Sequence, residues 1–156
     1  MTGRDIRIRL AQPSDCDQLA RMRHALWPDT TVEEHARELI PVLAGKGSLP
    51  TPAVTLVAEA PGQVLVGFLE ADLRSHADGC DTSHAVGFIE GWYVAESNRN
   101  RGLGKKLLAA AEDWARTQGC VEMASDTWID SDLSQRVHEA LGYEVVDRCV
   151  HYRKTL

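Results

Sequence analysis

The sequence contains no apolar run long enough to cross a bilayer, which takes about 18 consecutive apolar residues. Its opening stretch alternates charged residues with isoleucine, whereas a signal peptide has a continuous apolar region. It also has no long polar or low-complexity tract, and 44% of its 156 residues are hydrophobic. These absences argue against a membrane protein and a disordered chain. We therefore expect a cytoplasmic protein, folded as one domain over residues 1–156.

Cysteine is scarce and scattered. The four cysteines, Cys16, Cys80, Cys120 and Cys149, form no CxxC pair, which excludes the usual zinc and thioredoxin-type motifs. We expect no metal site. We also expect reduced thiols, as in most chains without a secretion signal.

The chain has no excess of positive charge. Its net charge is −6, and its cations cluster mainly around residues 99–106. Nucleic-acid binding needs a broad basic face, so we expect no nucleic-acid partner. An excess of carboxylates would instead suit a cationic substrate.

The cation-rich segment lacks the two best-known glycine motifs for phosphate. GxxxxGK[ST] does not fit it, and GxGxxG fails because Leu107 stands where the last glycine would be. The segment instead reads Arg99-x-x-Gly102-x-Gly104, between an apolar strand and a long amphipathic helix. A helix N-terminus presents unpaired N–H groups and partial positive charge, and glycine lets a phosphate approach the backbone. The segment therefore predicts an anion site.

Hydrophobic periodicity and turn residues predict a mixed α/β fold without internal repeats. A Pro61-Gly62 turn predicts a hairpin between two of the strands. The predicted helices span residues 13–27, 30 or 31 to 43, 102–118 and 130–141, and the predicted strands span residues 4–10, 54–60, 64–73, 86–94 and 121–126, with one or two more in 143–153.

The glycine segment resembles the acetyl-coenzyme A pyrophosphate signature, R/Q-x-x-G-x-G/A, of the GNAT superfamily of N-acetyltransferases. The resemblance covers essentially the whole chain. It implies an α/β GNAT fold, with a mixed, mostly antiparallel, twisted sheet of six or seven strands that is flanked by about four helices and splayed at the acetyl-CoA site. Gly87 and Gly91 are compatible with a bulge in the splayed strand. By the resemblance, the cofactor-binding residues are Trp92, Tyr93, Val94, Arg99, Asn100, Arg101, Gly102, Leu103, Gly104 and Lys105.

A closer resemblance is to the aminoglycoside 6'-N-acetyltransferases, which acetylate the 6'-amino group of antibiotics such as kanamycin and tobramycin and are generally dimeric. It implies acetyl-CoA as co-substrate, direct attack in a ternary complex, a homodimer and a role in antibiotic resistance. It also implies substrate contacts by Trp27, Glu90, Asp126 and Asp147, with His76 where a close relative has tyrosine. The matching segments are residues 26–28, 78–81, 88–91, 122–127, 134–135 with 137–138, 140–142 and 152–154.

The residues themselves point to two catalytic carboxylates. Glu90 is the single acid of a nine-residue apolar strand, and Asp126 ends the next strand. If the sheet brings both strand ends to one cleft, the two carboxylates can orient a cationic amine and relay its proton. Glu90 on a solvent-facing side and Asp126 in a cap or turn are the structural alternatives.

A proton donor for the leaving thiolate is harder to choose. Many superfamily members have a tyrosine where this chain has His138. Histidine titrates near neutrality and can donate a proton. A packed or exposed helix position for His138 stays open, with Tyr93, Tyr143 or solvent as the donor instead.

Two other functions remain compatible with the sequence. The first is an acetyltransferase of the same fold that acts on another small amine, a polyamine or a peptide N-terminus. The second is a non-catalytic acyl-CoA-binding module, in which the isolated acids would be structural.

Overall fold

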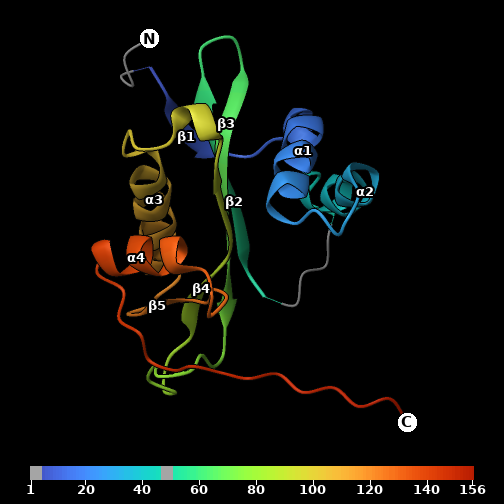
Figure 1. Cartoon of the computed structure of the whole chain (residues 1–156). Coiled ribbons are helices and arrows are strands. Elements are labelled where there is room, and N and C mark those ends of the chain that lie inside the picture. Colours follow the sequence, from blue (N-terminus) through green and yellow to red (C-terminus); the bar gives the residue numbers. More distant parts are fainter. Residues whose placement is uncertain (1–4, 47–50) are drawn as a thin grey trace.

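The computed structural model in Figure 1 describes residues 5–46 and 51–156 and contains one twisted sheet. The strands lie side by side in sequence order, and every pair is antiparallel except the last, which is parallel. This mixed sheet confirms the predicted fold class. Its strands within the described residues are β1 (Arg7–Leu10), β2 (Ala53–Ala60), β3 (Val64–Arg74), β4 (Val86–Val94) and β5 (Met123–Ser125).

Helices cover both faces of the sheet (Figure 1). On one face Leu19 and Leu39 pack against Phe68 in a buried cluster, and on the other Leu107 packs against Leu69. The first face carries α1 (Cys16–Leu26) and α2 (Val32–Leu43), the second carries α3 (Leu103–Thr117) and α4 (Asp132–Ala140), and two short 3-10 turns, η1 (Pro13–Asp15) and η2 (Glu96–Asn98), precede α1 and α3.

Local sequence signals set several element ends. Thr31 caps α2 in a capping box, because its hydroxyl accepts from the Glu34 N–H while the Glu34 carboxylate accepts from the Thr31 N–H. The β2–β3 hairpin turns through Gly62 and Gln63, which both have positive φ, at 80° and 61°. The predicted strand start at residue 4 lies outside the described residues.

The predicted strands in residues 143–153 do not form, so the described residues contribute five strands instead of six or seven. Residues 144–156 run away from the body as an extended segment, the C-terminal tail (Figure 1). Val145, Val146 and Val150 favour extended backbone but are 55%, 60% and 67% exposed. A strand also needs a partner edge, and the tail pairs with none of the chain's described strands.

The parallel pair of strands diverges as the resemblance predicts. Only residues 87–89 of β4 pair with β5. β4 then continues to Val94 with no partner on that side among the described residues. This opening between β4 and β5, called the splay below, leaves backbone N–H and C=O groups of β4 unpaired.

Candidate functional site

An anion cradle lies where α3 begins. Gly102 precedes the helix with φ 73°, and no side chain caps the N-terminus. The N–H groups of Leu103 to Lys105 therefore have no acceptor within the helix, and they sit at its positive end. A Cβ on Gly102 would meet nothing within 4 Å, so glycine serves the left-handed backbone there and leaves the approach open.

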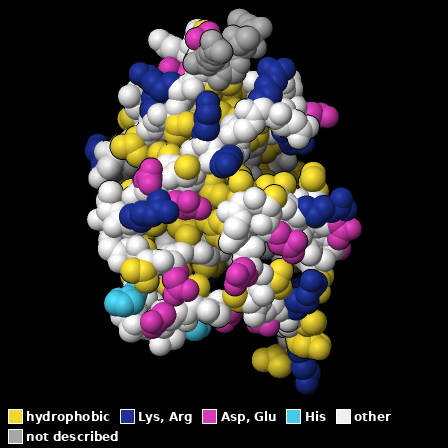
Figure 2. Space-filling model, turned by 90° about the vertical axis from the view of Figure 1, so that its left-hand side faces the viewer, with side chains coloured by type: hydrophobic (Ala, Val, Ile, Leu, Met, Phe, Trp, Pro, Cys, Tyr) yellow, Lys and Arg dark blue, Asp and Glu magenta, His cyan; other side chains and the backbone are white. Residues whose placement is uncertain are grey.

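The cations of this loop have different roles. The Arg99 Nε donates to the Val94 carbonyl at 2.8 Å, so this side chain ties the loop to the end of β4. Arg101 and Lys105 are exposed beside the free amides. Figure 2, which looks onto the α3 side, shows Lys and Arg side chains mostly in the upper part of this face and Asp and Glu mostly below.

The second glycine of the signature serves packing. A Cβ on Gly104 would lie 3.2 Å from Cζ2 of Trp92, so glycine lets α3 approach β4 closely. Trp92 also packs edge-on against His138, with ring centroids 5.7 Å apart. The predicted cofactor residues on β4 and on the loop therefore share one end of the splay.

Glu90 is the extra residue of a β-bulge. Glu70 of β3 pairs with Gly91, and Ala71 pairs with Ile89, so Glu90 has no partner in the ladder. Bulges re-aim side chains and occur beside active sites. The Glu90 Oε1 accepts from Arg74 Nη2 at 2.6 Å, and the side chain is 37% exposed.

Trp27 lies against the bulge. A Cβ on Gly91 would lie 2.4 Å from Cη2 of Trp27, so the ring takes the space that a side chain would need. Phe68 holds the ring edge-on from the core side, at a centroid distance of 6.3 Å. The structure therefore places Trp27 and Glu90, which are far apart in sequence, beside each other.

Asp126 stands at the same level as Glu90. Ile89 and Ser125 are the last paired residues of the parallel strands, and the two acids directly follow them. Asp126 is exposed and makes no hydrogen bond or ion pair to any described residue. Both predicted carboxylates thus stand at the mouth of the splay.

The other two predicted substrate residues lie apart. His76 is in the loop after β3, where its Nε2 is 3.6 Å from Asp78 Oδ1. Asp147 is in the C-terminal tail, and its Oδ1 accepts from the Arg148 N–H. Among the described residues, no hydrogen bond or ion pair joins either one to Glu90.

His138 is held on both ring nitrogens. Its Nδ1 is 2.7 Å from the Ser134 carbonyl, which can only accept, so Nδ1 carries a hydrogen. In the neutral ring, Nε2 then accepts from the Ser125 hydroxyl at 2.9 Å. Tyr143 packs edge-on against the ring. His138 therefore faces the splay through Ser125.

Tyr143 is a poor proton donor. Burial, followed by the nearby Glu112 carboxylate, raises the pKa of Tyr143 well above its usual range. Its hydroxyl donates to Glu112 Oε1 at 3.1 Å. This geometry removes Tyr143 from the alternatives to His138.

Sequence reasoning missed Asp72 and Arg74. Arg74 lies over the Phe88 ring, with its Cζ 3.4 Å from the centroid, and bridges to Glu90. Burial, followed by the charge of Glu90, raises the pKa of Asp72 to about 6. A signal was present, because charges at 70, 72 and 74 fall on one face of an otherwise apolar strand.

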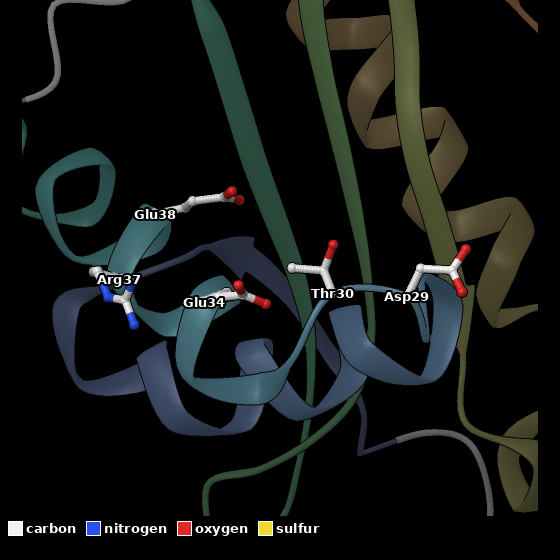
Figure 3. Close-up of a pocket in the computed structure, with 5 residues that line it drawn as sticks. All are labelled: Asp29, Thr30, Glu34, Arg37 and Glu38. Atoms are coloured by element: carbon white, nitrogen blue, oxygen red, sulfur yellow. The ribbon is translucent and has the colours of Figure 1, made fainter.

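A separate polar hollow lies beside α2 (Figure 3). Glu34 belongs to the capping box, and Glu38 pairs with Arg23 at 3.3 Å. These two carboxylates therefore have structural partners. The hollow is lined by Asp29, Thr30, Glu34, Arg37 and Glu38.

Within residues 5–46 and 51–156, no group of His, Cys, Asp and Glu side chains is arranged to hold a metal ion. No helix in these ranges has the length and apolar character needed to cross a membrane. All four cysteines are free.

Comparison with known proteins decides the family. The profile of the Acetyltransferase (GNAT) family matches residues 19–143. Aminoglycoside N(6')-acetyltransferase type 1 of Klebsiella aerogenes is 40% identical over 149 residues, 96% of each chain. The chain belongs to the aminoglycoside N(6')-acetyltransferases of the GNAT family. The family and fold expected from the sequence are confirmed.

Solved N(6')-acetyltransferases share the fold. The chain superposes on AAC(6')-Iy, in complex with the bisubstrate analog CoA-S-monomethyl-acetylneamine, with a TM-score of 0.81, 35% identity and coverage of 97% of this chain and 99% of that one. It superposes on AAC(6')-Ih from Acinetobacter baumannii with a TM-score of 0.84, 27% identity and the same coverage. The uncapped α3 amides, with open space at Gly102, fit the diphosphate of coenzyme A, which forms part of the analog in complex with AAC(6')-Iy.

Proposed function

We propose that this chain transfers an acetyl group from acetyl-CoA to the 6'-amino group of aminoglycoside antibiotics and so confers resistance to them. The relatives with that name support the substrate class. One observation carries the assignment to this chain's own residues. The parallel register brings Glu90 and Asp126 to the mouth of a splay whose other side is an anion cradle.

The cofactor side of the splay holds acetyl-CoA and orients its thioester. The N–H groups of Leu103 to Lys105 donate to the diphosphate, and Arg101 adds charge, while Arg99 and Asn100 shape the loop. On the side away from β3, the backbone of Trp92 to Val94 has no strand partner among the described residues and lines the path of the pantetheine arm, with the Val94 carbonyl held by Arg99. When bound, acetyl-CoA supplies the thioester whose carbonyl carbon the substrate amine attacks.

The acidic side gathers a polycation. Glu90 and Asp126 accept charge-assisted hydrogen bonds from ammonium groups, which makes recognition both electrostatic and directional. Trp27 forms an apolar wall beside them. Transfer directly within the ternary complex removes a proton from the nitrogen as the C–N bond forms, and adds one to the sulfur as the C–S bond breaks.

His138 is our proposed source of the proton for sulfur. In this step the ring carries a hydrogen on both nitrogens. Nε2–H passes its proton to the Ser125 oxygen while the Ser125 hydroxyl proton moves to the sulfur, which leaves His138 neutral with Nδ1–H still on the Ser134 carbonyl. Trp92 and Tyr143 hold the ring in place. The geometry favours this route over direct donation, because both ring nitrogens of His138 already have hydrogen-bond partners.

We also propose a homodimer built on the C-terminal tail. The tail leaves its own chain with apolar side chains exposed, Tyr152 at 92% among them, and β5 offers a three-residue edge. A second copy that exchanges tails would cover them. Asp147 of each copy would then join the substrate site of the other copy, and His76, which lies in the loop that the tail crosses at Gly79, would line the same region.

The tail provides its own test. A chain that ends at residue 143 should run as a monomer in sedimentation velocity, whereas the full chain should run as a dimer. A full chain that stays monomeric at micromolar concentration would contradict the dimer. Tyr152→Ala keeps the tail length and should weaken the dimer without abolishing it.

We propose that residues 1–156 act as one catalytic domain in the cytoplasm, with reduced thiols and without nucleic-acid or membrane partners. The four free cysteines and a net charge of −6 support this setting.

A thiol-release assay with matched substrates tests the function. We expect turnover with an aminoglycoside that carries a 6'-amine and none with its counterpart that carries a 6'-hydroxyl. Turnover only with spermidine or a short peptide would show that the substrate is a polyamine or a peptide and not an aminoglycoside. Tight CoA binding without turnover on any amine would point to a non-catalytic binding module.

A further inference from the structure

Asp72, Arg74 and Glu90 form one charged group on the α1 side of the sheet. Arg74 Nη2 donates to Glu90 Oε1 at 2.6 Å, and its Nε lies 3.9 Å from Asp72 Oδ1. Phe88 supports the guanidinium from below, at 3.4 Å from ring centroid to Cζ. A single cation thus stands between two carboxylates.

The strand register explains this arrangement. Asp72 pairs with Phe88 in the ladder, and alternation along β4 puts Glu90 on the same face as Phe88. Because Glu90 is the inserted residue of the bulge, Gly91 takes the place opposite Glu70, and the Glu90 carboxylate lies beside Arg74. Asp72 Oδ1 is fully buried and has no hydrogen-bond partner among the described residues.

The Asp72 side chain as a whole is 29% exposed, so a substrate reaches this carboxylate through Oδ2, while the buried Oδ1 makes its ionised form costly. A buried carboxylate oxygen without a donor is costly, and protonation removes that cost. The other charged groups on this face are already satisfied, because Glu70 pairs with Arg23 through two hydrogen bonds of 2.8 Å. Asp72 is therefore the group of this cluster that is best able to take up a proton.

We propose that Asp72 accepts the proton of the substrate ammonium. In the free protein, Arg74 occupies the place beside Glu90 that this ammonium takes when the substrate binds. The step rests on the proposed function. A substrate N–H bond breaks, an O–H bond forms on Asp72, and the electron pair of the broken bond stays on nitrogen for attack. Glu90 holds the substrate by accepting hydrogen bonds from its other ammonium groups.

The neighbours set the pH at which Asp72 can act. Burial raises the pKa of Asp72 first, the Glu90 charge raises it further, and Arg74 lowers it, with a result of about 6. Asp72 accepts a proton only when it is ionised. The value of kcat/KM should therefore rise with pH through about 6 and be lost below it.

Three substitutions should move that limb in different ways. Glu90→Gln removes a negative neighbour and should shift the limb to lower pH, whereas Arg74→Gln removes a positive neighbour and should shift it to higher pH. Asp72→Asn should abolish the limb and lower kcat by about tenfold or more, as loss of general-base catalysis implies. A structural role alone would lower activity without these opposite shifts. Asp113→Asn on α3, in an exposed ion pair with Arg116, is the matched control and should leave the profile unchanged.

The experiment combines pH profiles of kanamycin acetylation with a carboxyl-carbon NMR titration of the free protein, which needs no turnover. We expect Asp72 to titrate near 6 and to follow the same shifts in the Glu90 and Arg74 variants. An active wild type whose Asp72→Asn variant keeps the limb would overturn this step alone. An inactive wild type, on kanamycin and on its relatives, would overturn the proposed function and this step with it.

The folding stability supplies a check that is independent of substrate. An aspartate whose pKa is higher in the folded state than in the unfolded state lowers the stability of the fold as pH rises. The loss falls between pH 3.8, the ordinary pKa of aspartate, and about 6, the pKa of Asp72 in the folded protein. Asp72→Asn should therefore raise Tm at pH 8 relative to the wild type and leave the difference small at pH 4. An unchanged Tm difference across that range would contradict the perturbed titration.

Discussion

The two sides of the splay are built in different ways. The anion cradle comes from one short segment, in which Arg99 closes a loop, Gly102 turns the backbone and α3 begins uncapped. The acidic side is assembled from distant segments, with Trp27 from the end of α1 and Glu90 and Asp126 from two strands. A local site depends on backbone conformation, whereas an assembled one depends on packing and register.

Because the two sides are built differently, mutations on them should have different effects. On the cradle side, a side chain added to glycine should disturb one ligand contact and little else. On the acidic side, charge changes should alter substrate use, and changes in packing should cost stability as well.

Removal of either mouth carboxylate should have the largest effect. Glu90→Gln and Asp126→Asn should each lower kcat/KM for kanamycin by about tenfold or more, because a charge-assisted contact contributes about 1.5–3 kcal/mol. Calorimetry should show CoA binding within about twofold of the wild type. If both variants kept wild-type kinetics, the acids would have no part in the reaction.

Gly102→Val should weaken the cradle by a smaller amount. A β-branched residue in the left-handed region is strained by about 1–2 kcal/mol, and its side chain would enter the open approach to the amides. The matched control is Gly119→Val, because Gly119 follows the other end of α3, also has positive φ, at 86°, and also has open space around it. Both variants should lose similar stability, but only the first should bind CoA several-fold more weakly. Equal CoA affinity in the two would refute the cradle.

Gly91→Ala should act mainly through packing. The added carbon would lie 2.4 Å from the Trp27 ring, which must move, and overpacking of this kind costs about 1–3 kcal/mol. We expect a lower Tm together with a raised KM for the aminoglycoside and unchanged CoA affinity. Trp27→Ala in the same chain should restore the Tm in part. If Gly91→Ala leaves both Tm and KM unchanged, Trp27 does not depend on this contact.

The sequence predicted the local backbone geometry of the cradle more fully than the assembled geometry of the acidic side. The spacing of Arg99, Gly102 and Gly104 predicts the cradle, because the loop and the helix that follows it lie within a few residues of each other in the sequence. Glu90 and Asp126 were found as isolated acids on apolar strands, but the bulge that aims Glu90 depends on the register with β3. That register is a tertiary property, and no single segment encodes it.

Two other features escaped for the same physical reason. The charged residues of β3 at 70, 72 and 74 were within one strand and on one face, but their neighbours on α1 and β4 decide which of them is paired. The tail has the β-branched residues of a strand, yet a strand also needs a pairing partner, and the tail pairs with none of the described strands of its own chain. Propensity predicted extended backbone there correctly and could not predict the partner.

The most direct test of the account is the set of backbone amide shifts in a two-step NMR titration of the full chain. CoA added first should shift the amides of residues 92–94 and 102–105, and kanamycin added second should shift those of Trp27, Asp72, Glu90 and Asp126. If CoA leaves residues 102–105 unchanged, or if kanamycin binds away from the bulge, then the splay does not join the two substrates and the account is wrong.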